Sequence, residues 1–243
     1  MKRIFWPAFM GGVVYWFWRY LSPEHSTLVL QDKVVIVTGA SSGIGQALAA
    51  AFARRGAKVV LVALRPERLE AVQYEIQPYA SAVLPICADI TDSVQRASII
   101  EQTRAAFGGI DVLVNSIATG GNVTQATPEQ IQAIIEVNLT ATMLLTHEVI
   151  GAMTQGGYIV NITAERSANA VFSASKYGLL GFSHGLRREL VGTGIHVMLA
   201  VPSAQRIEMD AEAVVKGLVQ GKQELVLGNI PEQLHWWLER LNA

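Results

Sequence analysis

The stretch that most constrains the fold is VVIVTGASSGIGQALAAAFARRG, which begins at Val34. It joins an apolar run typical of a buried strand, a turn with three glycines and an alanine-rich segment typical of a helix. In such a turn Gly39 allows the tight bend, Gly43 lets the backbone approach a bound group, and Gly45 allows the helix to pack closely. Backbone N–H groups at the start of the helix then favour an anion. The stretch therefore predicts a turn that binds the pyrophosphate of a dinucleotide.

Strand-like and helix-like segments alternate along the rest of the chain. We expect strands at 33–38, 58–63, 82–88, 112–115, 158–163, 195–201 and 224–227, and helices at 44–55, 66–77, 94–107, 128–154 and 173–190. Continuous Val, Ile and Leu strands separated by helices predict a parallel sheet that is covered on both faces. The expected fold is α/β, a Rossmann-type doubly wound parallel sheet of about seven strands. It forms a single domain over residues 25–229, preceded by an N-terminal hydrophobic anchor segment.

Composition excludes several classes of function. The formal net charge is -1, the pI is near 6.5 and Lys and Arg do not cluster, so binding of nucleic acid is not expected. The single cysteine, Cys87, cannot form an internal disulfide. Because it lies in an apolar run, we expect it to be buried as a small apolar side chain. No metal site is predicted.

The first 24 residues predict a membrane anchor. Between Ile4 and Leu21 the only charge is Arg19, and aromatic residues crowd both ends of the run, as they do at membrane interfaces. A helix of this length spans about 27 Å, slightly less than a hydrocarbon core of about 30 Å. We expect membrane attachment through this run, either spanning or in the plane, with the Rossmann domain on the cytoplasmic side. Packing against an oligomer or a partner protein is the alternative.

The last residues, 230–243, predict an amphipathic helix. Apolar residues recur there at helical spacing, at Ile230, Leu234, Trp237, Leu238 and Leu241. Packing on the core or in a dimer is the simpler interpretation. In the alternative, Trp236 and Trp237 contact the membrane surface that holds the N-terminus.

The end of the second strand favours NADP(H) over NAD(H). In LVALRPERL, Ala63 occupies the place where an Asp or Glu would bind the ribose 2'-hydroxyl of NAD. Arg65 follows two residues later, and its guanidinium can pair with a 2'-phosphate. The alternative that no cofactor binds stays open.

Five motifs follow one another in a fixed order. They are the glycine turn from Thr38 to Gly45, CADIT with Asp89, DVLVN with Asn115, EVNL with Asn138, and SASK with Lys176. In this order and spacing, residues 31–228 resemble the classical short-chain dehydrogenase/reductase family. The resemblance implies a cofactor site made of Gly39, Ser41, Ser42, Gly43, Ile44, Gly45, Arg65, Asp89, Ile90, Asn115, Lys176 and Pro202.

The resemblance also implies roles for particular residues. Asp89 would contact the adenine, Asn115 would stabilise the central strand, and Asn138 would belong to a catalytic tetrad with a serine, a tyrosine and Lys176. Members of the family commonly form dimers and tetramers through the helices that hold Asn138 and Lys176. A homo-oligomer is therefore the expected assembly, with a larger membrane complex as the alternative.

The chain departs from the family at the residues that do the chemistry. In the family, a tyrosine four residues before the lysine donates a proton to the carbonyl oxygen, and a serine hydroxyl stabilises that oxygen. Phe172 occupies the tyrosine position and Ala164 the serine position, so Asn138 and Lys176 are the remnants of the tetrad. The loop between Ala164 and Phe172 is also shorter than is usual in the family.

Nearby residues offer weak substitutes for the lost groups. Tyr177 is adjacent to Lys176 and points about 100° away around a helix, so it is not expected to reach the same site. Ser167 and Ser173 carry hydroxyls, which lack the acidity of a phenol. The segment after the sixth strand has also changed, with Ser203 after Pro202 where the family usually has a glycine.

Three functions remain open from the sequence. The first is a membrane-associated NAD(P)(H)-binding protein that is catalytically degenerate and has a structural or sensing role. Losing the phenol forfeits general acid catalysis, typically worth roughly 10² to 10⁴-fold. The second is an atypical NADP-dependent oxidoreductase that reduces a lipophilic carbonyl or oxidises an alcohol, with Lys176 or a water it holds as the proton donor. The third is an accessory subunit of a membrane complex.

Overall fold

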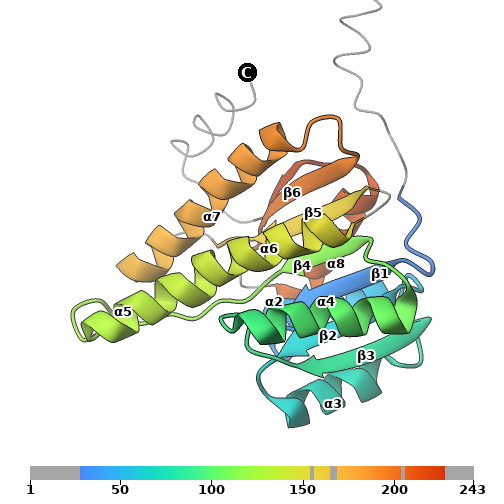
Figure 1. Ribbon diagram of the computed structural model, residues 1–243, viewed down its shortest axis with the longest axis horizontal. Helices are drawn as coiled ribbons and strands as arrows, with labels where there is room; N and C mark the ends of the chain where they lie inside the picture. The colour runs from blue at the N-terminus through green and yellow to red at the C-terminus, as the bar shows by residue number, and fades with distance from the viewer. Residues whose placement is uncertain (1–27, 154–155, 165–168, 204–205, 228–243) are drawn as a thin grey trace, which may run out of the picture.

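A parallel sheet forms the centre of the protein, as the continuous apolar runs predict (Figure 1). The computed structural model describes residues 28–153, 156–164, 169–203 and 206–227, so the predicted anchor and C-terminal helix lie outside the described residues. Within these residues the sheet has seven strands in the order β3-β2-β1-β4-β5-β6-β7. The strands are β1 (Val34–Thr38), β2 (Lys58–Ala63), β3 (Ala82–Cys87), β4 (Val112–Asn115), β5 (Gly157–Ile162), β6 (Ile195–Val201) and β7 (Glu224–Val226).

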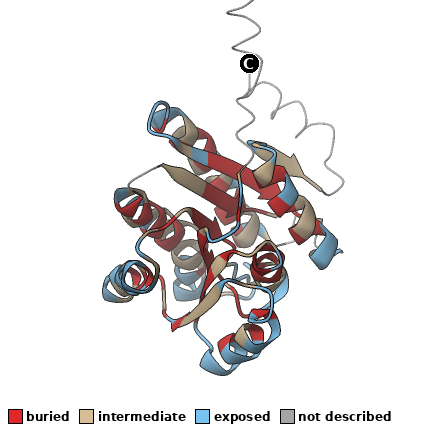
Figure 2. Cartoon of the chain, turned by 90° about the vertical axis from the view of Figure 1, so that its right-hand side faces the viewer, coloured by how far each residue is buried: buried red, intermediate tan, exposed pale blue. Residues whose placement is uncertain are grey.

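Helices cover both faces of the sheet, which makes the fold doubly wound. Alternate residues of β1 serve the two cores: Val35 and Val37 pack with one helix group, and Val34 and Ile36 pack with the other. Figure 2 shows the buried residues concentrated between these layers. The first group comprises α2 (Gly43–Ala53), α3 (Pro66–Ile76) and α8 (Ile207–Val219), and the second α4 (Ser93–Phe107), α6 (Ala141–Ala152) and α7 (Ala170–Glu189).

The predicted single helix at 128–154 is interrupted. The chain forms α5 (Pro128–Ile135), one π-helical turn (Glu136–Thr140) and then α6. A π turn inserts one extra residue into the helical hydrogen-bond ladder and frequently marks a functional site. This turn carries Asn138, whose contacts are described below.

Two other helix predictions were incomplete. Helix α7 begins at Ala170, three residues before the predicted start, because the Asn169 side chain accepts a hydrogen bond from the backbone N–H of Phe172 at 3.2 Å. Asn is a preferred N-cap residue, so the sequence did contain this signal. Helix α8 was not predicted, and it completes the first helix layer beside α2.

The prediction for Cys87 was wrong. The thiol is exposed and lies 3.5 Å from the backbone oxygen of Leu64. Cys87 is the last residue of β3, and β3 is an edge strand of the sheet. A position at the end of an edge strand has few neighbours to cover it, although the sequence around it is apolar.

One helical stretch of the described residues is long and apolar enough to cross a membrane, namely Pro128–Ala152. Helices that cover a protein core pass the same test. Leu145 and Val149 of this stretch are fully buried in the second core. The stretch is thus a structural part of the domain, and it does not replace the predicted anchor between Ile4 and Leu21.

Candidate functional site

The motif residues gather at one edge of the sheet. The strand order reverses between β1 and β4, and in open parallel sheets ligands bind at the carboxyl ends of the strands beside such a reversal. The glycine turn follows β1, Arg65 follows β2, Asp89 follows β3, and Lys176 approaches the ends of β4 and β5. Residues far apart in the sequence are therefore brought to one site.

The glycine turn has the shape that a phosphate needs. Gly39 has φ +67° and Gly43 has φ +57°, a backbone region that side chains disfavour. A Cβ at Gly45 would collide with the backbone oxygen of Gly39 and would lie 2.6 Å from Oγ of Ser116. In contrast, a Cβ at Gly43 would have no atom within 4 Å. The turn is thus tightly packed on the protein side and open on the side where a phosphate would approach.

The start of helix α2 has no side-chain cap. Ser42 is the N-cap residue, and its side chain makes no cap hydrogen bond. The first turn also contains no acidic residue. The N–H groups and the positive end of the helix dipole are therefore available to an anion.

Arg65 lies beside the glycine turn. Its guanidinium donates a hydrogen bond to Oγ of Ser41 at 3.4 Å, although the two residues belong to different strand-to-helix connections. Ser41 is buried, whereas Leu64 next to Arg65 is 64% exposed. The pair places one cation beside one hydroxyl at the end of β2, and none of Leu64, Arg65 and Pro66 carries a carboxylate.

Asp89 follows β3 and Asn115 ends β4, and their side chains make different contacts. Oδ1 of Asp89 accepts hydrogen bonds from the backbone N–H and the hydroxyl of Thr91 at 2.9 and 2.8 Å, and the next residue, Ile90, is buried. Nδ2 of Asn115 donates to Oγ1 of Thr146 at 2.9 Å and to Oδ1 of Asn161 at 2.8 Å. Asn115 thereby links β4 to β5 and to α6, whereas a contact between Asp89 and adenine stays a prediction.

Asn138 connects the π turn to two other parts of the site. Its Oδ1 accepts from the backbone N–H of Thr119 at 2.8 Å, and its Nδ2 donates to the backbone oxygen of Thr119 at 2.7 Å. Nδ2 also donates to Oγ of Ser175 at 3.0 Å. The side chain is fully buried. Asn138 therefore fixes the loop after β4 against helix α7, and sequence reasoning did not identify its partners Thr119 and Ser175.

The Lys176 side chain is buried in the site. Its Nζ donates to the backbone oxygens of Ile117 at 3.1 Å and Ile162 at 3.2 Å, and the residue is 4% exposed. Burial lowers the pKa of Lys176 to about 8, because the charged form loses its hydration. Desolvation is the cause of this shift, and no charged group in the part of the chain that the structure describes contributes to it.

The two replaced positions of the tetrad carry no hydroxyl, as the sequence predicts. The Phe172 ring centroid lies 5.7 Å from Nζ of Lys176, one helical turn away, and carries no proton to donate. Ala164 follows β5 and has no hydroxyl. Oγ1 of the adjacent Thr163 donates to the backbone oxygen of Lys176 at 3.1 Å and is buried. The hydroxyl nearest to the serine position is thus used to hold helix α7.

The structure tests one of the substitutes that the sequence offered, Tyr177. Tyr177 is 46% exposed, in agreement with its predicted direction away from the buried Lys176. Ser173 lies in the first turn of α7, and Ser167 lies outside the described residues.

Pro202 is buried after β6, and both the backbone N–H and Oγ of the next residue, Ser203, donate to Asp210 at 2.7 Å.

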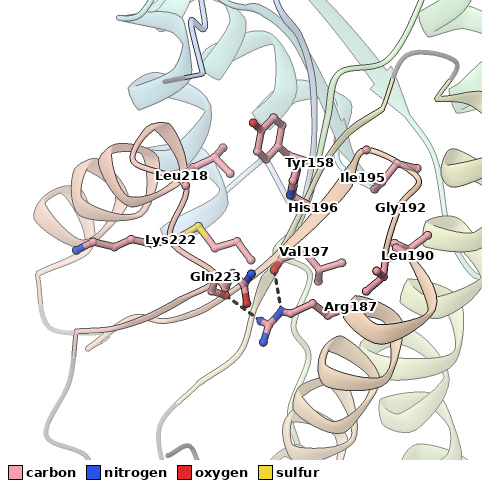
Figure 3. A pocket seen from close by; sticks show the side chains of 14 residues that line it. Tyr158, Arg187, Leu190, Gly192, Ile195, His196, Val197, Leu218, Lys222 and Gln223 are labelled. Atoms are coloured by element: carbon pink, nitrogen blue, oxygen red, sulfur yellow. Dashed lines mark hydrogen bonds between the residues drawn. The ribbon is translucent and has the colours of Figure 1, made fainter. Parts of the chain in front are cut away.

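A separate cavity lies at the opposite, amino edge of the sheet (Figure 3). It encloses about 290 Å³ between the end of α7, the start of β6 and the turn before β7. Arg187 donates across it to the backbone oxygens of Val197 at 3.3 Å and Gln223 at 3.0 Å and pairs with Glu224 at 3.1 Å. Arg187 is thus occupied in joining α7 to β6 and β7. Elsewhere in the described residues, no three His, Cys, Asp or Glu side chains gather to hold a metal.

The fold and the site together define a dinucleotide-binding domain of the dehydrogenase type. The family described as short chain dehydrogenase matches residues 33–216, and the chain belongs to this family. It is 36% identical over 183 residues to an uncharacterized oxidoreductase of Staphylococcus saprophyticus, covering 71% of this chain and 78% of the relative. The 3-oxoacyl-(acyl-carrier-protein) reductase FabG of Escherichia coli is 32% identical over 210 residues, covering 83% of each chain.

Solved structures lead to the same family. A metagenomic short-chain oxidoreductase in complex with NADP has a TM-score of 0.74 and 33% sequence identity, covering 84% of this chain and 100% of that one. The domain therefore has the fold of a nicotinamide-cofactor oxidoreductase. The glycine turn, open at Gly43 and closely packed at Gly45, fits such a cofactor.

Proposed function

We propose that this chain is a membrane-attached, NADP(H)-binding member of the short-chain dehydrogenase family that has lost the family's carbonyl reduction. The proposal rests on the contrast between the retained and the replaced residues of one site. The glycine turn, Asn138 and Lys176 keep an ordered arrangement, whereas Phe172 and Ala164 present no hydroxyl. The protein would then serve a structural, sensing or accessory role that depends on cofactor binding.

The proposal can be tested by calorimetric titration of the full-length protein in detergent with NADPH and, separately, with NADH. We expect NADPH to bind more tightly, because the Arg65 guanidinium lies beside Ser41 of the glycine turn and can pair with a 2'-phosphate. The NADP complex of the solved neighbour supports the same preference. Absence of binding for both cofactors would overturn the proposal.

Arg65→Ala is expected to weaken NADPH binding by about 10- to 100-fold, since a hydrogen bond to a charged group contributes about 1.5–3 kcal/mol. NADH binding should change little, because it lacks the 2'-phosphate. Arg68→Ala is a matched control, since Arg68 is exposed three residues further on, in α3, and its loss changes the net charge equally. An equal loss of affinity for NADPH and NADH would show that Arg65 does not recognise the 2'-phosphate.

A second candidate is an atypical reductase of a lipophilic carbonyl. The two tetrad residues that the chain keeps, Asn138 and Lys176, favour it, because both side chains are buried and hydrogen-bonded within the site. Lys176, or a water it holds, would supply the proton. In that case Lys176→Met should abolish NADPH-dependent reduction while the protein stays folded by circular dichroism. An unchanged rate would rule this candidate out.

Membrane attachment between Ile4 and Leu21 and assembly through the helices that hold Asn138 and Lys176 remain parts of the proposal. Attachment predicts that the protein sediments with membranes and is released by detergent but not by high salt. Assembly predicts a homodimer or tetramer in mild detergent, and co-purification with larger partners would favour the accessory-subunit role instead.

A further inference from the structure

We propose that the amino edge of the sheet lies on the lipid surface, so that the candidate site at the carboxyl edge faces away from the membrane. The amino edge consists of the loops that precede the strands. This orientation rests on the membrane attachment proposed above. It follows from the place where the chain enters the domain and from the side chains that are exposed around that place.

The chain enters the domain at the amino edge. Asp32 donates its backbone N–H to the backbone oxygen of Gly56 at 2.8 Å and accepts a hydrogen bond from Oγ of Ser81 at 2.7 Å. Lys33 pairs with Asp111 at 2.7 Å. Gly56, Ser81 and Asp111 lie just before β2, β3 and β4, so these contacts fix the entering chain across three loops of this edge. Figure 2 looks onto this edge of the sheet.

The predicted anchor ends close to this entry point. Seven residue steps separate Leu21, the end of the apolar run, from Leu28, the first described residue. A fully extended chain covers at most about 3.6 Å per residue, so the link reaches no more than about 25 Å. Leu28 packs against the first core and thereby belongs to the domain. An anchor in the bilayer therefore holds the amino edge within that distance of the lipid.

Large apolar side chains are exposed on three loops of this edge. Val29 is 68% exposed before β1, Tyr79 is 61% exposed before β3, and Val191 is 81% exposed before β6. Val191 also lines the cavity at this edge. Tyrosine is enriched at membrane interfaces, because its ring is apolar and its hydroxyl is polar. The surface nearest to the anchor thus offers apolar groups to the lipid from several loops.

The charges of these loops allow contact with anionic headgroups. Asp32 and Asp111 are the acids among their described residues. Asp111 pairs with Lys33, and Asp32 accepts the hydrogen bond from Ser81. Lys222, in the turn before β7, is exposed and forms no ion pair with another residue that the structure describes. A negatively charged lipid surface therefore meets a free cation and two acids that already have partners.

The carboxyl edge also exposes large apolar side chains, namely Leu64, Val94, Val123 and Met209. Exposure alone therefore does not distinguish the two edges. The seven residues of β6 rise about 3.3 Å each, which puts the carboxyl edge about 20 Å farther from the entry point. The short link thus favours the amino edge as the surface that contacts lipid. Cofactor and substrate would then reach the candidate site from water.

The single cysteine of the chain provides a label at the carboxyl edge. Cys87 ends β3 and is exposed, and no second cysteine competes for a thiol-reactive bimane fluorophore. Cys87→Ser combined with Val191→Cys, or with Tyr79→Cys, moves the label to the amino edge. The labelled full-length protein is reconstituted into vesicles of phosphatidylcholine and phosphatidylglycerol with brominated acyl chains, which quench a fluorophore only at short range. Circular dichroism checks that each variant is folded.

We expect the label at position 191 or 79 to lose most of its fluorescence relative to vesicles without bromine, and the label on Cys87 to keep it. Quenching at Cys87 as strong as at position 191 would overturn the orientation and leave membrane attachment intact. Protein that floats with the vesicles without quenching at any position would also overturn it, because the domain would not contact lipid. Protein that does not float would overturn attachment and orientation together, whereas NADPH binding is measured separately by calorimetry.

Discussion

Gly45→Ala is expected to reduce NADPH affinity by at least about 100-fold and to lower the free energy of unfolding by about 3 kcal/mol. The added Cβ would collide with the backbone oxygen of Gly39 and lie 2.6 Å from Oγ of Ser116. Moving backbone atoms costs more free energy than moving a flexible side chain, so the start of α2 must shift away from the turn. The first-turn N–H groups would then no longer converge on the phosphate. Calorimetric titration and urea unfolding measure the two effects.

Gly185→Ala is the matched control for this substitution. Gly185 lies within α7, and a Cβ there would meet nothing within 4 Å. Alanine should therefore stabilise the helix, by roughly 0.5–1 kcal/mol, and leave NADPH binding unchanged. If Gly45→Ala bound NADPH as tightly as the wild type, the glycine turn would not be the phosphate site.

Phe172→Tyr combined with Ala164→Ser is expected to raise NADPH-dependent reduction of an alkyl ketone by about 10³-fold or more. General acid catalysis contributes roughly 10² to 10⁴-fold, and a hydrogen bond to the developing oxyanion contributes a comparable factor. The Phe172 ring already lies one helical turn from Lys176 and is half-buried, so a hydroxyl can be added without removing packing. Steady-state kinetics with NADPH in excess provide the measurement.

The single variants and a triple variant serve as controls. Phe172→Tyr alone should recover most of the rate, because the phenol supplies the proton. Adding Lys176→Met to the double variant should remove the gain, since the lysine then no longer lowers the pKa of the phenol. If the double variant binds NADPH but gains no activity, the changes after β6, around Ser203, rather than the lost hydroxyls, would limit catalysis.

The strands were predictable because each is an apolar run bounded by polar or glycine residues. The predicted bounds 58–63, 112–115 and 195–201 agree with β2, β4 and β6. Such strands are buried on both faces, so hydrophobicity alone marks them. Cys87 shows the limit of this reasoning: its neighbours in sequence are apolar, yet its place at the end of an edge strand leaves it exposed.

The internal contacts of the candidate site were less predictable. Asn138 lies in the π turn at Glu136–Thr140 and bonds Thr119 and Ser175, which are distant in the sequence. The helical pattern of neighbouring residues gives no information about hydrogen bonds to residues that are distant in the sequence. The contact between Arg65 and Ser41 likewise joins two separate loops.

The sequence by itself determined the doubly wound fold, the glycine turn and the loss of the tyrosine and serine. These features depend on local residue types: apolar runs, glycines that accept positive φ, and side chains with or without a hydroxyl. Only the tertiary structure decided the state of Lys176. Its two backbone acceptors come from the ends of β4 and β5, and its lowered pKa comes from burial among segments that meet only when the chain is folded. Desolvation is a property of that packing, so the residue type alone could not reveal it.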